Sequence, residues 1–165
     1  MNIQELTISL EEGGIAPEYS TEGAAGLDFF ACLPDKGHLE IPHGSKRTIP
    51  LGVRAVVPEG WGLLLLSRSG HAFKDISLSL TNCVGLIDSD YRGVVAASLE
   101  HKLSSTVKGV RTSFWHPPFI VRHGDKICQG FLIEIPKVAI KVVSKDELLA
   151  MTTARGEDGF GSTGS

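Results

Sequence analysis

Short apolar stretches recur along the whole chain, and residues that favour turns separate them. The segment ELTISL at 5–10 alternates apolar and polar residues, which is typical of a strand with one buried face. The run WGLLLL at 61–66 is continuously apolar and ends in a polar turn, which also favours a strand. Strand-like composition is found again in KRTIPLGVRAVV, which divides around Leu51 and Gly52, and in GVVAASLE, PPFIV, KICQGFLIEI and VAIKVV (46–57, 93–100, 117–121, 126–135 and 138–143). The pattern predicts an all-β fold, either a barrel or a sandwich.

Helical signals are scarce. Ser144 and Glu147 have the spacing of a capping box, which predicts one or two helical turns from Ser144. The residues after Gly70, in GHAFKD, predict another short helix. Only residues 155–165, RGEDGFGSTGS, are low in complexity. We therefore expect one β domain over residues 1–154 and a flexible C-terminal tail over 155–165.

Composition and charge narrow the classes of protein. A chain of 165 residues suits a single domain, and a formal charge of −3 gives no electrostatic reason to expect binding to nucleic acid or to a membrane. The longest apolar run, LLLL at 63–66, is far too short to span a bilayer, and the N-terminus does not resemble a secretion signal. These features predict an intracellular protein, cytoplasmic or nuclear. Its three cysteines, Cys32, Cys83 and Cys128, have no metal-ligand spacing, so we expect buried, inert thiols.

Two polar positions interrupt the apolar pattern in a way that suggests chemistry. Asp28 lies among apolar residues in AAGLDFFA, so its carboxylate must either face solvent or be paired. Arg68, Ser69 and Gly70 follow an apolar strand and precede a predicted helix. A guanidinium, a hydroxyl and backbone N–H groups at such a junction favour an anion site, although a solvated turn is the alternative for so short a string.

The segment NCVGLIDSDYRGVV at 82–95 is more specific. It is predicted to form a hairpin in which Gly85 permits close backbone approach and Asp88 lies at the tip, in a position where it can be buried. Tyr91 follows Asp88 by three positions, so a small planar ligand would fit between the two side chains. Further along the chain, Lys126 and Gln129 lie where a turn enters an apolar strand.

Taken in order, five short motifs resemble those of the trimeric deoxyuridine triphosphatases (dUTPases). The motifs are AGLD at 25–28, RSG at 68–70, GLIDSDYRG at 85–93, GDKICQ at 124–129 and RGEDGFGSTG at 155–164. The resemblance implies a jelly-roll-like β-barrel subunit and a homotrimer with sites at its subunit interfaces. It also implies Mg²⁺-dependent cleavage of dUTP to dUMP and pyrophosphate, which keeps uracil out of DNA and supplies dUMP for thymidylate synthesis.

The resemblance also implies roles in the chemical step. Asp88 would be the base that deprotonates the water attacking the α-phosphorus, and Asp28 would hold Mg²⁺ through the water shell of the ion. Gln129 would bond near the α-phosphate from a neighbouring subunit. The RSG string, Arg68, Ser69 and Gly70, would grip the phosphates.

Selectivity is expected from the predicted hairpin and from the tail. The Asn82 amide and the backbone of Gly85, Leu86 and Ile87 would match the polar edge of uracil. The ring of Tyr91 would lie under the deoxyribose and exclude a 2′-hydroxyl. In the tail, which would act as a lid, Arg155 would neutralise the γ-phosphate and Phe160 would stack on uracil. Gly161, Ser162 and Thr163 would wrap the outer phosphates.

The chain departs from the family pattern in places; these departures bear on the level of activity rather than on the type of reaction, and two alternative interpretations are considered besides. Lys126 and Cys128 stand where the family usually has arginine and alanine, and segment 102–118 is longer than the usual connection. One alternative is a deoxycytidine triphosphate deaminase, which has a similar fold but needs a catalytic glutamate beside the pyrimidine. The other is a non-catalytic protein that binds a protein partner through segment 102–118, where Phe114 and Trp115 lie beside two prolines.

Overall fold

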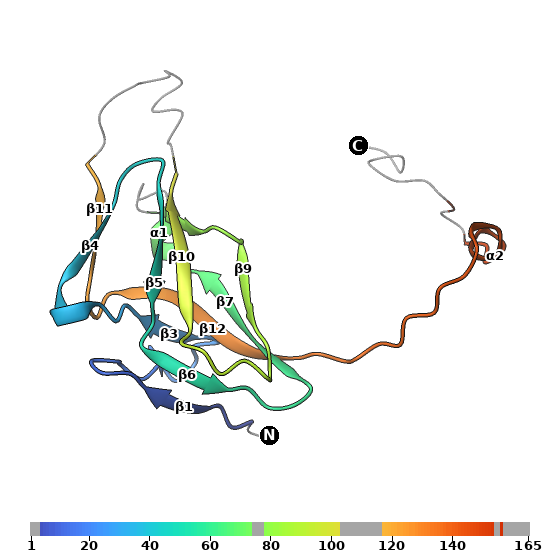
Figure 1. The fold of residues 1–165 in the computed structure, drawn as a ribbon, viewed down its shortest axis with the longest axis horizontal. Coiled ribbons are helices and arrows are strands. Elements are labelled where there is room, and N and C mark those ends of the chain that lie inside the picture. Colours follow the sequence, from blue (N-terminus) through green and yellow to red (C-terminus); the bar gives the residue numbers. More distant parts are fainter. Residues whose placement is uncertain (1–3, 74–77, 103–116, 154–155, 157–165) are drawn as a thin grey trace, which may run out of the picture.

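A computed structural model of the chain describes residues 4–73, 78–102, 117–153 and 156. Most of this part forms short antiparallel strands around one core, and a C-terminal segment leads away from that core (Figure 1). The strands are β1 (Thr7–Leu10), β2 (Glu18–Tyr19), β3 (Leu27–Phe30), β4 (His38–Ile41), β5 (Lys46–Pro50), β6 (Val53–Val56), β7 (Trp61–Ser67), β8 (Leu78–Leu80), β9 (Val84–Ile87), β10 (Ala96–His101), β11 (Phe119–Arg122) and β12 (Lys126–Glu134). The helical segments are a 3-10 turn, η1 (Pro34–Lys36), and two α-helices, α1 (Ser69–Phe73) and α2 (Lys145–Leu149).

The strands form four small sheets in a jelly-roll-like arrangement. The largest has the order β2-β3-β12-β7-β9, and a second has the order β5-β10-β8. Two further pairs, β1 with β6 and β4 with β11, complete the described part. The prediction of an all-β, jelly-roll-like fold is confirmed. In the ranges that the structure describes, no helix is long and apolar enough to cross a bilayer.

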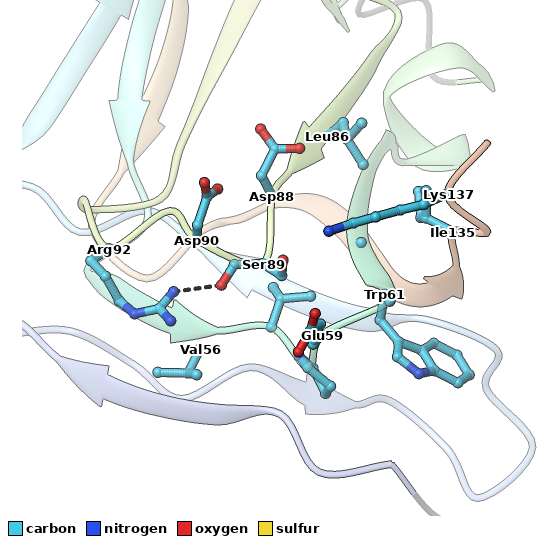
Figure 2. A pocket seen from close by; sticks show the side chains of 14 residues that line it. Val56, Glu59, Trp61, Leu86, Asp88, Ser89, Asp90, Arg92, Ile135 and Lys137 are labelled. Atoms are coloured by element: carbon cyan, nitrogen blue, oxygen red, sulfur yellow. Dashed lines mark hydrogen bonds between the residues drawn. The ribbon is translucent and has the colours of Figure 1, made fainter. Parts of the chain in front are cut away.

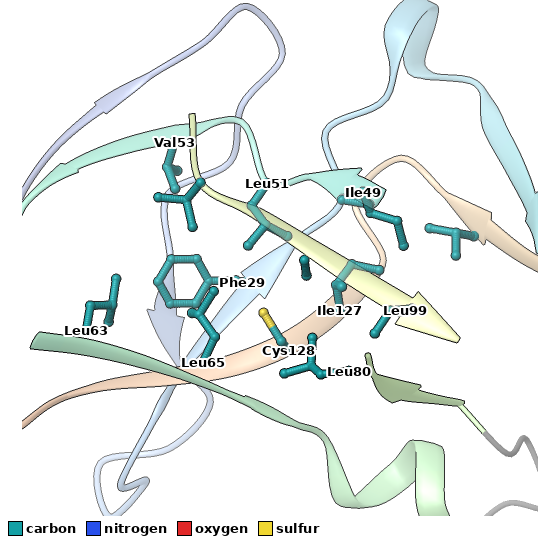
Figure 3. Close-up of a cluster of buried hydrophobic side chains, with 14 of the residues drawn as sticks. Phe29, Ile49, Leu51, Val53, Leu63, Leu65, Leu80, Leu99, Ile127 and Cys128 are labelled. Carbon is teal, nitrogen blue, oxygen red and sulfur yellow. The ribbon is translucent and has the colours of Figure 1, made fainter. Parts of the chain in front are cut away.

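One apolar core joins the sheets (Figure 3). Phe29 of β3, Leu65 of β7 and Leu99 of β10 are all at most 2% exposed. The apolar run of β7 has a direct explanation, because Leu63 and Leu65 are buried while the intervening Leu64 is still half-buried. Both faces of this strand therefore need apolar side chains.

The prediction of three buried cysteines is right for one of them. Cys128 is completely buried in the core, but Cys32 is half-buried and Cys83 is exposed. Cys83 lies in the turn between β8 and β9 and adopts a φ of 61°. Burial raises the pKa of the Cys128 thiol to about 12, and the nearby Asp28 carboxylate adds to the rise.

The predicted hairpin at 82–95 is wrong. β9 pairs with β7, whereas β10 pairs with β5 and β8, so the two strands belong to different sheets. The loop between them is held elsewhere: the N–H of Val95 donates to the carbonyl of Val53, and the N–H of Leu51 donates to the carbonyl of Val95. These bonds fasten residues 88–95 to the β5–β6 corner, so this segment crosses between sheets.

The strand predicted at 138–143 is also absent within the described chain. Residues 136–143 run in an extended path away from the core, towards α2 (Figure 1). Val138, Ile140 and Val142 are 81%, 86% and 90% exposed, and in the described part of the chain they pair with no strand. The sequence supplies strand-forming residues here, but a strand also needs a neighbour to receive its backbone hydrogen bonds.

Both predicted helices are confirmed. The N–H of Glu147 donates to the Ser144 hydroxyl at 3.1 Å and caps α2, as the capping-box spacing predicts. The helix predicted after Gly70 is α1, which begins one residue earlier, at Ser69. The 3-10 turn η1 was not expected from the sequence, and within it Asp35 adopts a non-helical φ of 52°.

Candidate active site

Asp28 lies at the centre of a polar cluster in the largest sheet. Its side chain is completely buried, and both carboxylate oxygens have partners. Oδ2 accepts a hydrogen bond from the Ser20 hydroxyl at 2.5 Å and lies 2.8 Å from the Lys126 ammonium. Oδ1 accepts from the Gln129 amide at 3.2 Å and lies 3.4 Å from Nε of Arg68. Asp28 is therefore paired rather than solvent-facing.

The sheet register explains why these side chains meet. Gln129 of β12 lies directly opposite Asp28 of β3. A bulge at Ile127 interrupts the pairing between Lys126 and Cys128. Side chains alternate between faces along a regular strand, so residues 126 and 129 would point to opposite faces; the extra residue of a bulge brings them to the same one. The consecutive burial of Ile127 and Cys128 agrees with this change of phase.

The charges of the cluster favour an anion. Burial raises the pKa of Asp28, but the hydrogen bonds from Lys126, Ser20 and Gln129 and the charge of Arg68 outweigh it, and the net shift is downward. Asp28 is therefore ionised at neutral pH and holds two cations whose side chains stay about 30% exposed. Glu18 lies 3.8 Å from Lys126, but its side chain is 62% exposed. The buried carboxylate thus fixes two cations that can still reach a ligand.

A cavity of about 290 Å³ opens beside these cations. Its lining includes Arg68, Gly70, His71, Phe119, Asp125, Lys126 and Ile127. Ser69 is exposed at the start of α1. The Asp125 carboxylate is engaged locally, because it accepts the N–H of Arg122 at 2.7 Å. The predicted string of Arg68, Ser69 and Gly70 is therefore brought together with Lys126, a residue to which the sequence assigned no role in the site.

A second, smaller cavity lies at the start of the β9–β10 loop. It has a volume of about 200 Å³ and is lined by Leu86, Ile87, Asp88, Tyr91, Val94, Val95 and Ala96. Asp88 is exposed at this cavity, which corrects the expectation that it could be buried: residue 88 follows the last residue of β9 and has left the sheet. The structure thus brings Asp88 and Tyr91 together around a space of the size of a small planar group.

The Tyr91 ring folds back over its own loop. Its hydroxyl donates to the carbonyl of Val94 at 3.1 Å, and its N–H donates to the carbonyl of Asp88. Gly93 makes this possible, since a Cβ there would collide with the tyrosine oxygen. The motif at 85–93 includes Gly93, but the reason a glycine is needed there depends on where the ring of Tyr91 lies.

Asn82 and Gly85 hold the backbone on either side of Val84. The carbonyl of Asn82 accepts from the N–H of Val84 at 2.6 Å. A Cβ at Gly85 would lie 3.2 Å from Cβ of Leu65, so this glycine makes room for the neighbouring strand β7. Leu86 is 50% exposed and Ile87 is half-buried, and both line the smaller cavity.

A larger cavity, of about 760 Å³, also has Asp88 in its lining and is poorly suited to a phosphate. Figure 2 shows Asp88 and Asp90 on one side and Trp61 and Lys137 across from them, with Glu59 below. The three carboxylates outnumber the lysine. Arg92, which also lines the space, uses its guanidinium to hold the carbonyls of Ser89 and Tyr91. The Asp28 cluster is better suited to bind a triphosphate.

The two halves of the predicted site do not meet within one chain. The cavity at Arg68 and the cavity at Asp88 share no lining residue. Asp28 lies in register with Val84 across strands β12 and β7, and Asp88 follows Val84 by four residues. From β3 to β9 the separation is three strand spacings of about 4.8 Å, and from Val84 to Asp88 it is four residues of about 3.3 Å each. Asp28 and Asp88 are therefore roughly 20 Å apart along the sheet.

Several predicted residues lie outside the part that the structure describes. They are Arg155, Phe160, Gly161, Ser162 and Thr163. Most of segment 102–118 also lies outside it. Among the described residues, the sequence missed Ser20, which it placed in no motif although its hydroxyl bonds Asp28.

Fold and site together define a small β-rich protein in which a buried carboxylate holds two partly exposed cations. Comparison with known proteins makes this specific. The dUTPase family model matches residues 12–164. A deoxyuridine 5′-triphosphate nucleotidohydrolase of Chlamydia pneumoniae is 38% identical over 94% of this chain and 95% of its own. One of Dinoroseobacter shibae is 39% identical, over 90% of this chain and 86% of its own. The chain belongs to the dUTPase family.

Solved structures agree on the fold. A Staphylococcus bacteriophage 80alpha dUTPase with dUPNHPP superposes with a TM-score of 0.80 at 23% identity, covering 99% of this chain and 100% of that one. A mutant dUTPase from phage phi11 of S. aureus, described with a structural Mg(II) ion, has a TM-score of 0.68 at 24% identity over 87% of this chain and 99% of that one. At these identities the likeness concerns the fold alone.

Proposed function

We propose that the protein hydrolyses dUTP to dUMP and pyrophosphate. Membership of the dUTPase family supports this activity. The observation that carries it is the pairing of two kinds of site in one fold. One is a buried carboxylate that fixes two partly exposed cations, and the other is an exposed carboxylate beside a cavity of about 200 Å³.

Asp88 is the proposed base. Hydrolysis of a phosphoanhydride needs a water aligned with the leaving group, and the base must lie within hydrogen-bond reach of that water. The exposure of Asp88 supports this role, because its carboxylate is free to meet water and nucleotide together. Proton transfer from the water to Asp88 generates the nucleophile; the water oxygen bonds to the α-phosphorus as the bond from that phosphorus to the bridging oxygen breaks, which gives dUMP and releases pyrophosphate.

The Asp28 cluster is the proposed phosphate grip. Arg68 and Lys126 neutralise charge on the phosphates, while the Ser69 hydroxyl and the backbone at Gly70 add donors. Gln129 lies beside the same carboxylate and would reach the α-phosphate. Asp28 itself touches Arg68, Lys126 and Gln129 and holds them in place.

Selectivity for the base and sugar is proposed to lie at the smaller cavity. Backbone groups of Gly85, Leu86 and Ile87, with the Asn82 amide, would bind the polar edge of uracil. The Tyr91 ring, held by its bond to Val94, would exclude a 2′-hydroxyl. Recognition by the backbone in this way leaves no room for the methyl group of thymine.

The donor set fits a metal ion that is carried by the nucleotide. Among the described residues, no group of three or more His, Cys, Asp and Glu side chains is arranged to hold a metal. Asp28 has both oxygens engaged and two cations beside it, so it would reach the water shell of an ion only by giving up a present contact. We propose that Mg²⁺ would be brought by dUTP rather than held by a cage of protein ligands, and that it would make pyrophosphate a better leaving group.

We propose that the protein is a homotrimer in which each site joins two subunits. The roughly 20 Å between Asp28 and Asp88 supports this arrangement, because a base that far from the phosphate grip cannot act on the same α-phosphorus. The exposed Val138, Ile140 and Val142 supply apolar area for contacts between chains. An extended segment with one apolar face is also able to pair with a strand edge of another subunit.

We further propose that residues 155–165 form a functional unit distinct from residues 1–154. Arg155, Phe160, Gly161, Ser162 and Thr163 would close over the nucleotide bound by the rest of the site. This arrangement would exclude water from the phosphates and add a ring that stacks on uracil.

The proposed function is tested by the products. The purified protein should release dUMP and pyrophosphate from dUTP and leave UTP, dTTP and dCTP unchanged. Release of ammonia from dCTP would instead identify a deaminase. Binding of dUTP without turnover would favour the non-catalytic alternative, in which segment 102–118 binds a protein partner.

A further inference from the structure

Ser20, Lys126 and Asp28 form a closed triangle of polar atoms. The Ser20 hydroxyl donates to Oδ2 of Asp28 at 2.5 Å. The Lys126 ammonium donates to the Ser20 hydroxyl at 3.0 Å and lies 2.8 Å from the same Oδ2. Each of the three groups therefore contacts the other two, although they come from three separate segments of the chain.

The chemistry of lysine explains why a hydroxyl is needed here. A guanidinium presents several N–H donors in a planar fork and can bind both oxygens of a carboxylate, whereas an ammonium acts as a point charge. The Ser20 hydroxyl accepts from the ammonium and donates to the carboxylate at the same time. It thus gives Oδ2 of Asp28 a second donor beside the ammonium, in place of the second N–H group that a planar guanidinium could direct at the same carboxylate.

The surroundings restrict the triangle to this geometry. Ser20 directly follows β2, a strand of only two residues whose sole partner within the described chain is β3. The Lys126 ammonium also lies 5.7 Å from the centre of the Phe30 ring, a cation–π contact that limits where it can move. The triangle therefore fixes the end of a weakly held edge strand as well as the position of the ammonium.

Asp28 links this triangle to the other residues of the phosphate grip. Its other oxygen holds Gln129 and Arg68, and Nη1 of Arg68 donates to the carbonyl of Lys126 at 3.3 Å. A carboxylate that rotates away from Ser20 and Lys126 must change these contacts too. The side chains of Arg68, Lys126 and Gln129 thus all depend on the orientation of one carboxylate.

We infer that Ser20 and Lys126 act as one positioning unit, in which the hydroxyl completes the hold of the lysine on Asp28 and so places Arg68 and Gln129 for the phosphates. Ser20 is a positioning residue, since it acts through Asp28. The inference deepens the proposed function and rests on it.

A double-mutant cycle on dUTP hydrolysis tests the unit. Ser20→Ala should raise KM by about ten-fold and change kcat by less than about three-fold, because the phosphate grip loosens while Asp88 is untouched. Lys126→Arg serves as the second background, and the effect of Ser20→Ala in it is measured relative to Lys126→Arg itself, whatever the kinetics of that single variant. Ser20→Ala in the Lys126→Arg background should cost less than about two-fold, since the guanidinium brings its own second donor.

Two further variants separate positioning from folding. Ser20→Thr keeps a hydroxyl and should restore the parental KM. Thr21→Ala removes an exposed hydroxyl that is not among the partners of Asp28, and should leave KM unchanged. Thermal unfolding of each variant shows whether the fold is kept.

The outcomes are distinct. An effect of Ser20→Ala that is equally large in both backgrounds overturns the coupled unit, and so does an unchanged KM for Ser20→Ala alone. If the unsubstituted protein does not hydrolyse dUTP, the proposed function fails by itself. The same cycle is then measured on binding of inorganic pyrophosphate, where loss of affinity in Ser20→Ala that disappears with Lys126→Arg still supports the unit, and its absence overturns it.

Discussion

The two aspartates of the proposed site sit in opposite environments. Asp28 is completely buried and bonded on both oxygens, whereas Asp88 is exposed at the mouth of a small cavity. The buried carboxylate organises cations that would otherwise move freely, and the exposed one is open to a water molecule and a ligand. A buried, fully paired aspartate is therefore suited to holding cations in place, whereas an exposed aspartate is suited to accepting a proton.

The largest effect is expected at the exposed aspartate. Asp88→Asn should lower kcat at least about 100-fold and leave dUTP binding nearly intact, because the amide keeps the shape but cannot accept the proton. Steady-state kinetics and equilibrium binding of a non-hydrolysable analogue measure the two quantities. Asp90→Asn, two residues along the same loop and also exposed, is the matched control and should stay active. Near-parental turnover by Asp88→Asn would remove it as the base.

A mixing experiment tests whether the two aspartates act on one substrate from different subunits. Asp88→Asn and Arg68→Ala are each expected to be nearly inactive. If each site takes its base from one chain and its cations from another, random co-assembly should restore about a quarter of parental activity, since one site in four receives both intact halves. Activity of the co-refolded mixture no higher than the sum of the separate variants would place both halves in one chain.

The tail is expected to matter less than the base. Stacking of a ring on a nucleobase contributes roughly 1–3 kcal/mol, so Phe160→Ala should lower kcat/KM by about ten-fold. Deleting residues 155–165 should cost more, because the proposed phosphate contacts are lost as well. Sedimentation should still give the parental assembly, and unchanged turnover by the deletion variant would contradict a role for the tail.

The smallest effect is expected for the stability provided by Asp28. Its pKa is lowered in the folded protein, so its contribution is present above the unfolded value of 3.8 and is lost as pH falls through the lower, folded value. Asp28→Asn should therefore reduce the free energy of unfolding by about 1 kcal/mol near pH 7. Urea unfolding at several pH values should show the gap between parent and variant closing below pH 3.8. A gap that stays constant into this range would contradict the pairing.

From the sequence, candidate site residues could be named where they depend on local pattern. Arg68, Asp88 and Gln129 could be named because their motifs are continuous in sequence. The partners of Asp28 could not be predicted, because they depend on sheet register and on a bulge that the composition of KICQGFLIEI does not reveal. Ser20 carried no signal of any kind in sequence.

The two errors in the fold have a common cause. Segment 82–95 has the pattern of a hairpin, and segment 138–143 has the composition of a strand. In both cases the local pattern is compatible with an extended chain, but pairing is decided by residues far away. Val95 bonds to Val53 and Leu51, and residues 138–143 find no neighbouring strand in the described chain. Periodicity along a segment predicts which residues adopt an extended conformation, whereas tertiary contacts determine which strand they pair with.

The bulge at Ile127 has a consequence for how the length of this strand can vary. Lys126 lies opposite Phe30 and Gln129 opposite Asp28, so three residues of β12 span the distance that two residues of β3 span. A chain that lacked Ile127 would form a regular ladder there, and Lys126 and Gln129 would still share one face. What it would lose is a core side chain, since Ile127 is only 1% exposed. Related chains that are one residue shorter at this point are therefore expected to keep the polar cluster and to compensate for the missing isoleucine elsewhere in the core.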